Sequence, residues 1–195
     1  MTYKRNQIIE GIEAALDHNR PSFQIVTRLK RLLNADRMLG RDPRSSVPEE
    51  ATYAFFSGPL AGSGNENWYS PFEAFAMFLG IRLMESGFPQ RTVVRILRSV
   101  RVELEDGVRT AWRADPADPA KARLYLARIA PEHPLDGSIA GTVRICRGEA
   151  AVATFLAKSS RGDVMTVFEL TSSIAGFKAA IERTSPSKRG RGVAD

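Results

Sequence analysis

The sequence predicts an α+β fold, in which a helical N-terminal domain with a helix-turn-helix is followed by a small α+β domain. Through the first half of the chain, apolar residues recur every three or four positions, which is the period of amphipathic helices. Beyond about residue 122 the period changes to two, as in half-buried strands. We therefore expect a helical domain over 1–106, a linker over 107–121, a small α+β domain over 122–184 and a basic, disordered tail over 185–195.

Composition limits the class of protein. The chain has 195 residues, of which 43% are hydrophobic and 26% charged, as in ordinary globular proteins. It holds one cysteine, so no internal disulfide can form. No apolar run is long enough for a membrane span or a signal peptide, which predicts a cytoplasmic protein. The 28 basic and 22 acidic residues give a net charge of +6, which favours a polyanionic partner.

Two helices are expected before residue 40. The first carries Ile8, Ile12 and Leu16 on one stripe, and the second runs from Ser22 until Gly40 ends it. Residues 40–52 and 57–67 are rich in turn formers and predict loops. Between these loops, residues 53–56 fit either a short strand or an aromatic anchor.

The most periodic part of the sequence follows. Ser70 and Pro71 are typical of a helix start, and the helix expected over 70–86 is apolar on nearly every side, so it predicts the buried centre of its domain. A turn at 87–89 leads to a further helix over 90–105. Its buried positions are expected at Val93, Leu97, Val100 and Leu104.

The C-terminal part predicts three strands and two helices. The strands are expected over 124–129, 142–147 and 164–170, with a helix over 149–158 between the second and the third. A final helix is expected to begin with Thr171 or Ser172 as its cap.

Residues 70–105 have the order of a helix-turn-helix, in which the second helix enters the major groove of DNA. At about 100° per residue, Arg91, Arg95 and Arg98 share a face opposite the apolar stripe. We expect base contacts from the start of this helix and phosphate contacts around it. The residues expected at bases are Gln90, Arg91, Thr92 and Arg95, and those expected at phosphates are Arg82, Arg98, Lys188, Arg189 and Arg191.

A family resemblance rests on three short runs in the same region. They are Tyr69-Ser70-Pro71-Phe72-Glu73-Ala74-Phe75, Ile81-Arg82-Leu83-Met84-Glu85-Ser86-Gly87-Phe88 and Val93-Val94-Arg95-Ile96-Leu97. Together they resemble the later part of the DNA-binding domain in MerR-type bacterial regulators. The resemblance implies transcription regulation. In that family these helices support a winged helix whose main recognition helix lies upstream, and the upstream residues here do not show that pattern.

The sequence leaves other partners and surfaces open. The helix from Ser22 is a rival DNA reader, because it exposes Arg28 and Arg31. The basic face also fits an acidic protein partner, as in an antitoxin-like accessory protein, and RNA binding is a third interpretation. Since one short reading helix rarely supplies enough affinity, we expect residues 122–184 to form a homodimer or to receive a protein partner.

No pattern predicts an enzyme, a cofactor or a metal site. The glycines of 58–64 lack the lysine and hydroxyl of a phosphate-binding loop, and the only histidines, His18 and His133, have no partner at a ligand spacing. Cys146 lies in a predicted strand beside Arg144 and Arg147, and we expect it to be a buried apolar side chain. The aromatics of 55–56 and 68–69 are expected in the core, although they could also stack on bases.

Overall fold

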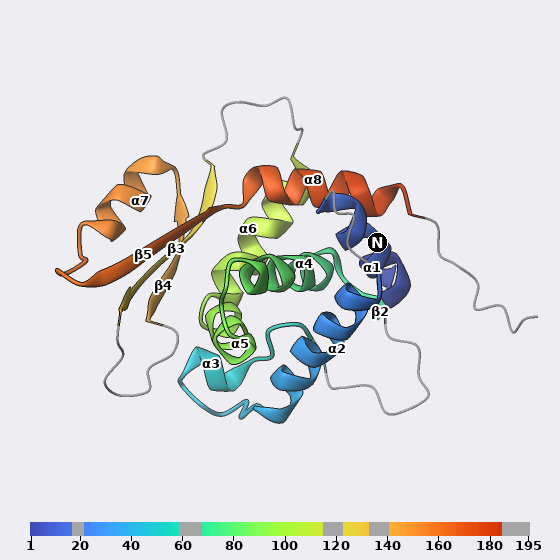
Figure 1. Cartoon of the computed structure of the whole chain (residues 1–195), viewed down its shortest axis with the longest axis horizontal. Coiled ribbons are helices and arrows are strands. Elements are labelled where there is room, and N and C mark those ends of the chain that lie inside the picture. Colours follow the sequence, from blue (N-terminus) through green and yellow to red (C-terminus); the bar gives the residue numbers. More distant parts are fainter. Residues whose placement is uncertain (17–21, 59–67, 115–122, 133–140, 185–195) are drawn as a thin grey trace, which may run out of the picture.

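The computed structural model describes residues 1–16, 22–58, 68–114, 123–132 and 141–184 (Figure 1). Its α+β class confirms the fold predicted from the sequence. The helices are α1 (Arg5–Ala15), α2 (Ser22–Met38), α3 (Pro48–Ala51), α4 (Pro71–Glu85), α5 (Gln90–Ser99), α6 (Arg101–Arg113), α7 (Glu149–Leu156) and α8 (Thr171–Glu182). The strands are β1 (Tyr3–Lys4), β2 (Trp68–Tyr69), β3 (Leu124–Pro131), β4 (Thr142–Arg147) and β5 (Asp163–Glu169).

Helix α4 is the centre of the helical body, as its apolar circumference predicts. It contacts α1, α2, α5, α6 and α8. A capping box fixes its start: the hydroxyl of Ser70 accepts from the Glu73 amide at 3.2 Å, and the Glu73 carboxylate accepts from the Ser70 amide at 2.7 Å. Pro71 at the first helical position adds a backbone already set for a helix.

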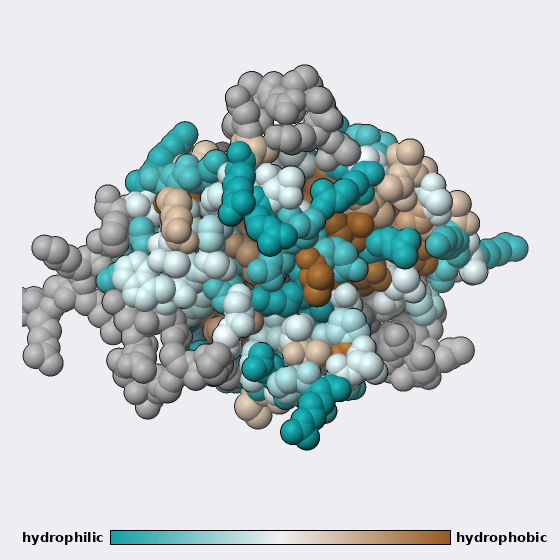
Figure 2. Space-filling view, turned by 180° about the vertical axis from the view of Figure 1, so that it is seen from behind, coloured by the Kyte–Doolittle hydropathy of each residue, from teal (hydrophilic) through white to brown (hydrophobic). Residues whose placement is uncertain are grey.

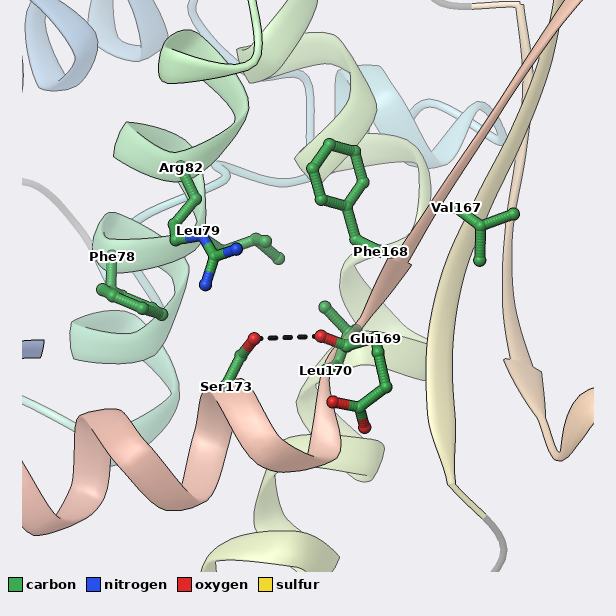
Figure 3. Close-up of a pocket in the computed structure, with 8 residues that line it drawn as sticks. All are labelled: Phe78, Leu79, Arg82, Val167, Phe168, Glu169, Leu170 and Ser173. Atoms are coloured by element: carbon green, nitrogen blue, oxygen red, sulfur yellow. Dashed lines mark hydrogen bonds between the residues drawn. The ribbon is translucent and has the colours of Figure 1, made fainter. Parts of the chain in front are cut away.

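Three antiparallel strands form a sheet in the order β4-β3-β5. Leu126 of β3 lies opposite Ile145 of β4 and Phe168 of β5, so these side chains share one face of the sheet. That face packs on the helical body, and the other face packs on α7 through Phe155 (Figure 1). A pocket lies where α4 faces the junction of β5 and α8 (Figure 3).

The predicted domain boundaries are wrong in two places. Residues 107–113 are not a linker but the second half of α6. Helix α8, expected in the C-terminal domain, packs along α1 and places Ile174, Phe177 and Ile181 in the main core. Burial of apolar side chains explains both differences, because the end of α6 and helix α8 each have an apolar face that would be exposed if the two regions were separate.

The helix expected over 90–105 is two helices. Val100, with φ −108° and ψ 13°, separates α5 from α6. Residues 53–56 form no strand; Phe55 and Phe56 are buried and act as an aromatic anchor. Helix α3 lies inside an expected loop, and the pairing of β1 with β2 had no signal in the sequence.

The surface is unevenly polar. Seen from behind, hydrophilic residues cover most of the molecule, and hydrophobic residues reach the surface toward the end that carries the sheet (Figure 2). Edge strand β5 exposes Val164, Met165 and Val167. Within the described ranges, none of the helices combines the length and the apolar character that crossing a membrane requires.

Candidate nucleic-acid interface

Helix α5, the expected DNA reader, lies among other helices rather than on an open face. It contacts α2, α3 and α4. Of its ten residues, six are buried and only Arg91 is exposed, with Arg95 half-buried. The spacing of about 100° per residue predicted one buried apolar stripe of α5 correctly. In the structure, α2 and α3 also cover a second side of this helix. An interface on α5 is therefore limited to the narrow strip of Arg91 and Arg95.

The expectation that Arg98 contacts phosphate is wrong. Its side chain is 3% exposed, and its Nε lies 2.7 Å from Oδ1 of Asp36, which is 0% exposed. The two terminal guanidinium nitrogens donate to the backbone carbonyls of Asp36 and Glu49, at 2.6 and 3.0 Å. Each of the three guanidinium nitrogens thus donates one hydrogen bond, and Asp36 balances the charge, so Arg98 joins α5 to α2 and to the start of α3.

Two more expected base contacts are not available in this arrangement. Thr92 is 2% exposed, because it faces the interior of the helical body, and its hydroxyl has no hydrogen-bond partner among the described residues. Gln90 donates from Nε2 to the carbonyl of Arg31 at 2.8 Å. Gln90 thus fixes the start of α5 against α2 instead of pointing away from the protein.

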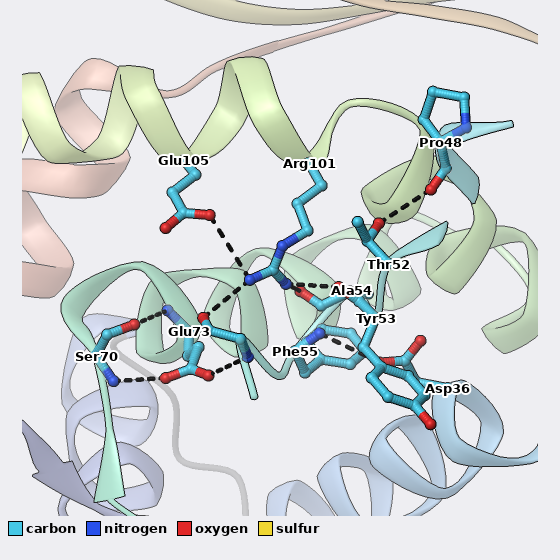
Figure 4. Close-up of polar contacts among 11 residues, drawn as sticks. Asp36, Pro48, Thr52, Tyr53, Ala54, Phe55, Ser70, Glu73, Arg101 and Glu105 are labelled. Carbon is cyan, nitrogen blue, oxygen red and sulfur yellow. Dashed lines mark hydrogen bonds and ion pairs between the residues drawn. The ribbon is translucent and has the colours of Figure 1, made fainter. Parts of the chain in front are cut away.

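A second buried arginine holds residues 53–57 in place. Arg101, at the start of α6, donates to the carbonyls of Tyr53 and Ala54 and to the hydroxyl of Ser57 (Figure 4). Glu73 completes the arrangement, because its Oε1 accepts from the Ser57 amide at 2.7 Å. The contacts of both arginines are structural.

Burial acts on the charges of this cluster. Desolvation raises the pKa of Asp36, while Arg98 and the amide of Phe55, which donates to Oδ2 at 3.2 Å, oppose that rise. Desolvation also lowers the pKa of Arg101, against the attraction of Glu105. Removing either cation would leave buried acceptors without their donors, so the cluster depends on both.

Four of the expected contact residues have exposed or half-buried side chains on α2 and α5, two helices that contact each other. We call Arg28, Arg31, Arg91 and Arg95 the α2–α5 basic surface. Gln90, the residue before Arg91, donates to the backbone carbonyl of Arg31. This hydrogen bond fixes the backbone of Arg31 beside the start of α5. Arg28 lies 3.8 Å from Glu85 at the end of α4. Across the described ranges, no carboxylate lies within ion-pair distance of Arg31, Arg91 or Arg95.

The other expected phosphate contacts lie elsewhere. Arg82 is half-buried in the pocket beside β5, with its guanidinium 5.9 Å from the ring centre of Phe78. Lys188, Arg189 and Arg191 fall outside the described residues. The predicted contact residues therefore lie in several places, and of those that the structure describes, Arg28, Arg31, Arg91 and Arg95 lie on the neighbouring helices α2 and α5.

Sequence reasoning missed the polar residues that hold the interior together. Asp36 had a usable signal, because it lies four residues after Leu32 and three after Leu33 on the apolar stripe of α2. A carboxylate at such a position requires a buried donor. Nothing in the sequence named Arg98 as that donor, since the pair is 62 residues apart.

Two further features of the described residues concern catalysis, namely the metal-ligating side chains and the thiol of Cys146. In the described part of the chain, no three His, Cys, Asp or Glu side chains come close enough to hold a metal ion. Cys146 is buried, and desolvation raises the pKa of its thiol more than nearby Arg144 lowers it. The thiol is thus protonated at neutral pH and poorly suited to act as a nucleophile.

Comparison with known proteins gives no relative. No protein-family model, no curated protein and no solved structure matches the chain. The resemblance to MerR-type regulators over residues 69–97 therefore stays a prediction.

Proposed function

We propose that the protein binds duplex DNA without catalysis, through phosphate contacts made by the α2–α5 basic surface. The observation that carries the proposal is the grouping of Arg31, Arg91 and Arg95 without carboxylate partners in the described part of the chain. Cations that face solvent together release counterions when they meet a phosphate backbone. Arginine suits this role, because its planar guanidinium donates two parallel hydrogen bonds to phosphate oxygens.

In a helix-turn-helix, the second helix contacts bases in the major groove, whereas the contacts proposed here are mainly with phosphates. With Thr92 and Arg98 buried and Gln90 bonded to α2, base contacts from α5 are restricted to Arg91 and Arg95. Phosphate contacts fix position but carry little sequence information. We therefore propose DNA binding with weak sequence preference, and a role in transcription regulation depends on contacts beyond this surface.

Fluorescence anisotropy with a labelled duplex of random sequence tests the proposal. The wild-type protein should bind at 50 mM salt and lose affinity steeply toward 200 mM. Arg91→Ala combined with Arg95→Ala should weaken binding and lower the slope of log affinity against log salt by about 2, because each phosphate contact contributes about 0.9.

A charge-matched variant distinguishes the effect of this surface on DNA binding from the effect of net charge. Arg144→Ala combined with Arg161→Ala removes the same two charges from exposed sites on β4 and before β5. That variant should retain the wild-type salt slope. Equal losses in the two variants, or no duplex binding at 50 mM salt, would contradict the proposal. Tighter binding of single-stranded RNA in the same titration would favour the RNA interpretation.

A further inference from the structure

The pocket between α4 and the β5–α8 junction has a volume of about 280 Å³. This is near the lower end of the range of about 300–1,000 Å³ for small-molecule sites. Its walls come from α4 (Phe78, Leu79, Arg82), from β5 (Val167, Phe168, Glu169) and from the start of α8 (Leu170, Ser173). Segments about 90 residues apart in the sequence thus enclose one space (Figure 3).

Arg82 supplies the one positive group among the residues that line this pocket, five of which are apolar. Its guanidinium extends from α4 toward Ser173, with the rings of Phe78 and Phe168 on either side (Figure 3). Its guanidinium carbon lies 5.9 Å from the centre of the Phe78 ring. Among the described residues, no carboxylate lies within 4.0 Å of its nitrogens. The guanidinium N–H groups that face the pocket are therefore available to a ligand.

The one carboxylate in the wall is already engaged. Glu169 accepts from the amides of Thr171 and Ser172, at 2.7 and 3.0 Å, and so caps the start of α8. Figure 3 shows this carboxylate turned away from Arg82, toward the helix. The hydroxyl of Ser173 donates to the Glu169 carbonyl at 2.9 Å, which leaves its oxygen free to accept.

We infer that this pocket binds a small organic carboxylate with an apolar body, whose carboxylate pairs with Arg82. The ligand's apolar part would contact Phe78, Leu79 and Phe168. Arginine pairs with carboxylates through two parallel hydrogen bonds, which are stronger where water is excluded. The inference does not depend on DNA binding, and its test contains no nucleic acid.

Titration with phenylacetate tests the inference on the full chain. Thermal unfolding and two-dimensional NMR would be followed as the concentration is raised. We expect the midpoint of unfolding to rise and amide signals of 78–82 and 167–173 to shift. Phenylacetamide has the same shape without the charge, and it should bind at least tenfold more weakly.

Two variants test whether Arg82 supplies the positive charge that pairs with the ligand. Arg82→Gln should weaken phenylacetate binding at least tenfold, and Arg95→Gln, which removes an arginine outside the pocket, should leave it unchanged. Far-UV circular dichroism of each variant without ligand checks that the fold is retained. Equal binding of phenylacetate and phenylacetamide, unchanged binding in Arg82→Gln, or no response to phenylacetate would overturn the inference.

Discussion

At the scale of single residues, charge placement depends on what lies beside a helix and not only on the helix itself. Arg91, Arg95 and Arg98 share one face of a wheel, yet Arg98 is buried against Asp36 while Arg91 is exposed. The difference arises because α2 and α3 approach α5 from the side that carries Arg98. A wheel drawn for one helix contains no information about such neighbours.

Replacing Arg98 with alanine tests how much this buried pair contributes to the stability of the fold. The variant leaves the Asp36 carboxylate buried without its cation, so we expect a loss of about 3–5 kcal/mol in the free energy of unfolding. Arg95→Ala is the matched control, because Arg95 has no such partner, and it should change stability by less than about 0.5 kcal/mol. Urea unfolding of both variants provides the measurement, and similar small losses would contradict a structural role for Arg98.

The loss of stability in Arg98→Ala should also depend on pH, in a direction that the pKa of Asp36 determines. Burial already raises the pKa of Asp36, and removing Arg98 removes the main opposing effect, so the pKa should rise further. A carboxyl whose folded pKa lies above its unfolded value stabilises the fold at low pH and loses that contribution as pH rises through the folded pKa. The penalty of Arg98→Ala should therefore be larger at pH 7.5 than at pH 4.5. Adding Asp36→Asn should abolish this difference.

At the scale of elements, local signals predicted most helices and strands but not where two elements meet. Ser70, Pro71 and Glu73 mark the start of α4 in the sequence and in the structure. The start of α8 is different: Thr171 is its first residue, and the carboxylate of Glu169 caps it. The break between α5 and α6 has neither glycine nor proline, and the contacts of Arg98 and Arg101 on either side of it are long-range. Such contacts could not be predicted from local sequence.

The crossing of α1 and α8 depends on a glycine. A Cβ at Gly11 would lie 2.9 Å from the Cβ and 3.1 Å from the Cα of Ile181. We expect Gly11→Ala to lower the free energy of unfolding by about 1–3 kcal/mol, because the two helices must move apart. Gly176→Ala in α8 is the control: a Cβ there meets nothing within 4 Å. It should stabilise the protein by about 0.5–1 kcal/mol, as alanine does in a helix. Stabilisation by both changes would disprove close packing at Gly11.

At the scale of the whole molecule, the sequence predicted the order of helical and mixed regions but not their shared core. The change of period near residue 122 marks a real change from helices to strands. It does not mark an independent unit, because α8 returns to the first helix of the chain. Periodicity reports which face of an element is buried, but it does not report which other element buries that face.

Phe177 provides the test of a shared core. Its ring is fully buried and stacks on Phe78 of α4, with the ring centres 4.8 Å apart. Phe177→Ala should cost about 3–5 kcal/mol. Since one core joins both regions, hydrogen exchange should accelerate in peptides of α1 and α4 as well as in β3 and α8. Phe23→Ala, at a side chain that is 74% exposed, should leave exchange unchanged. Faster exchange confined to residues 122–184 would instead favour two independent domains.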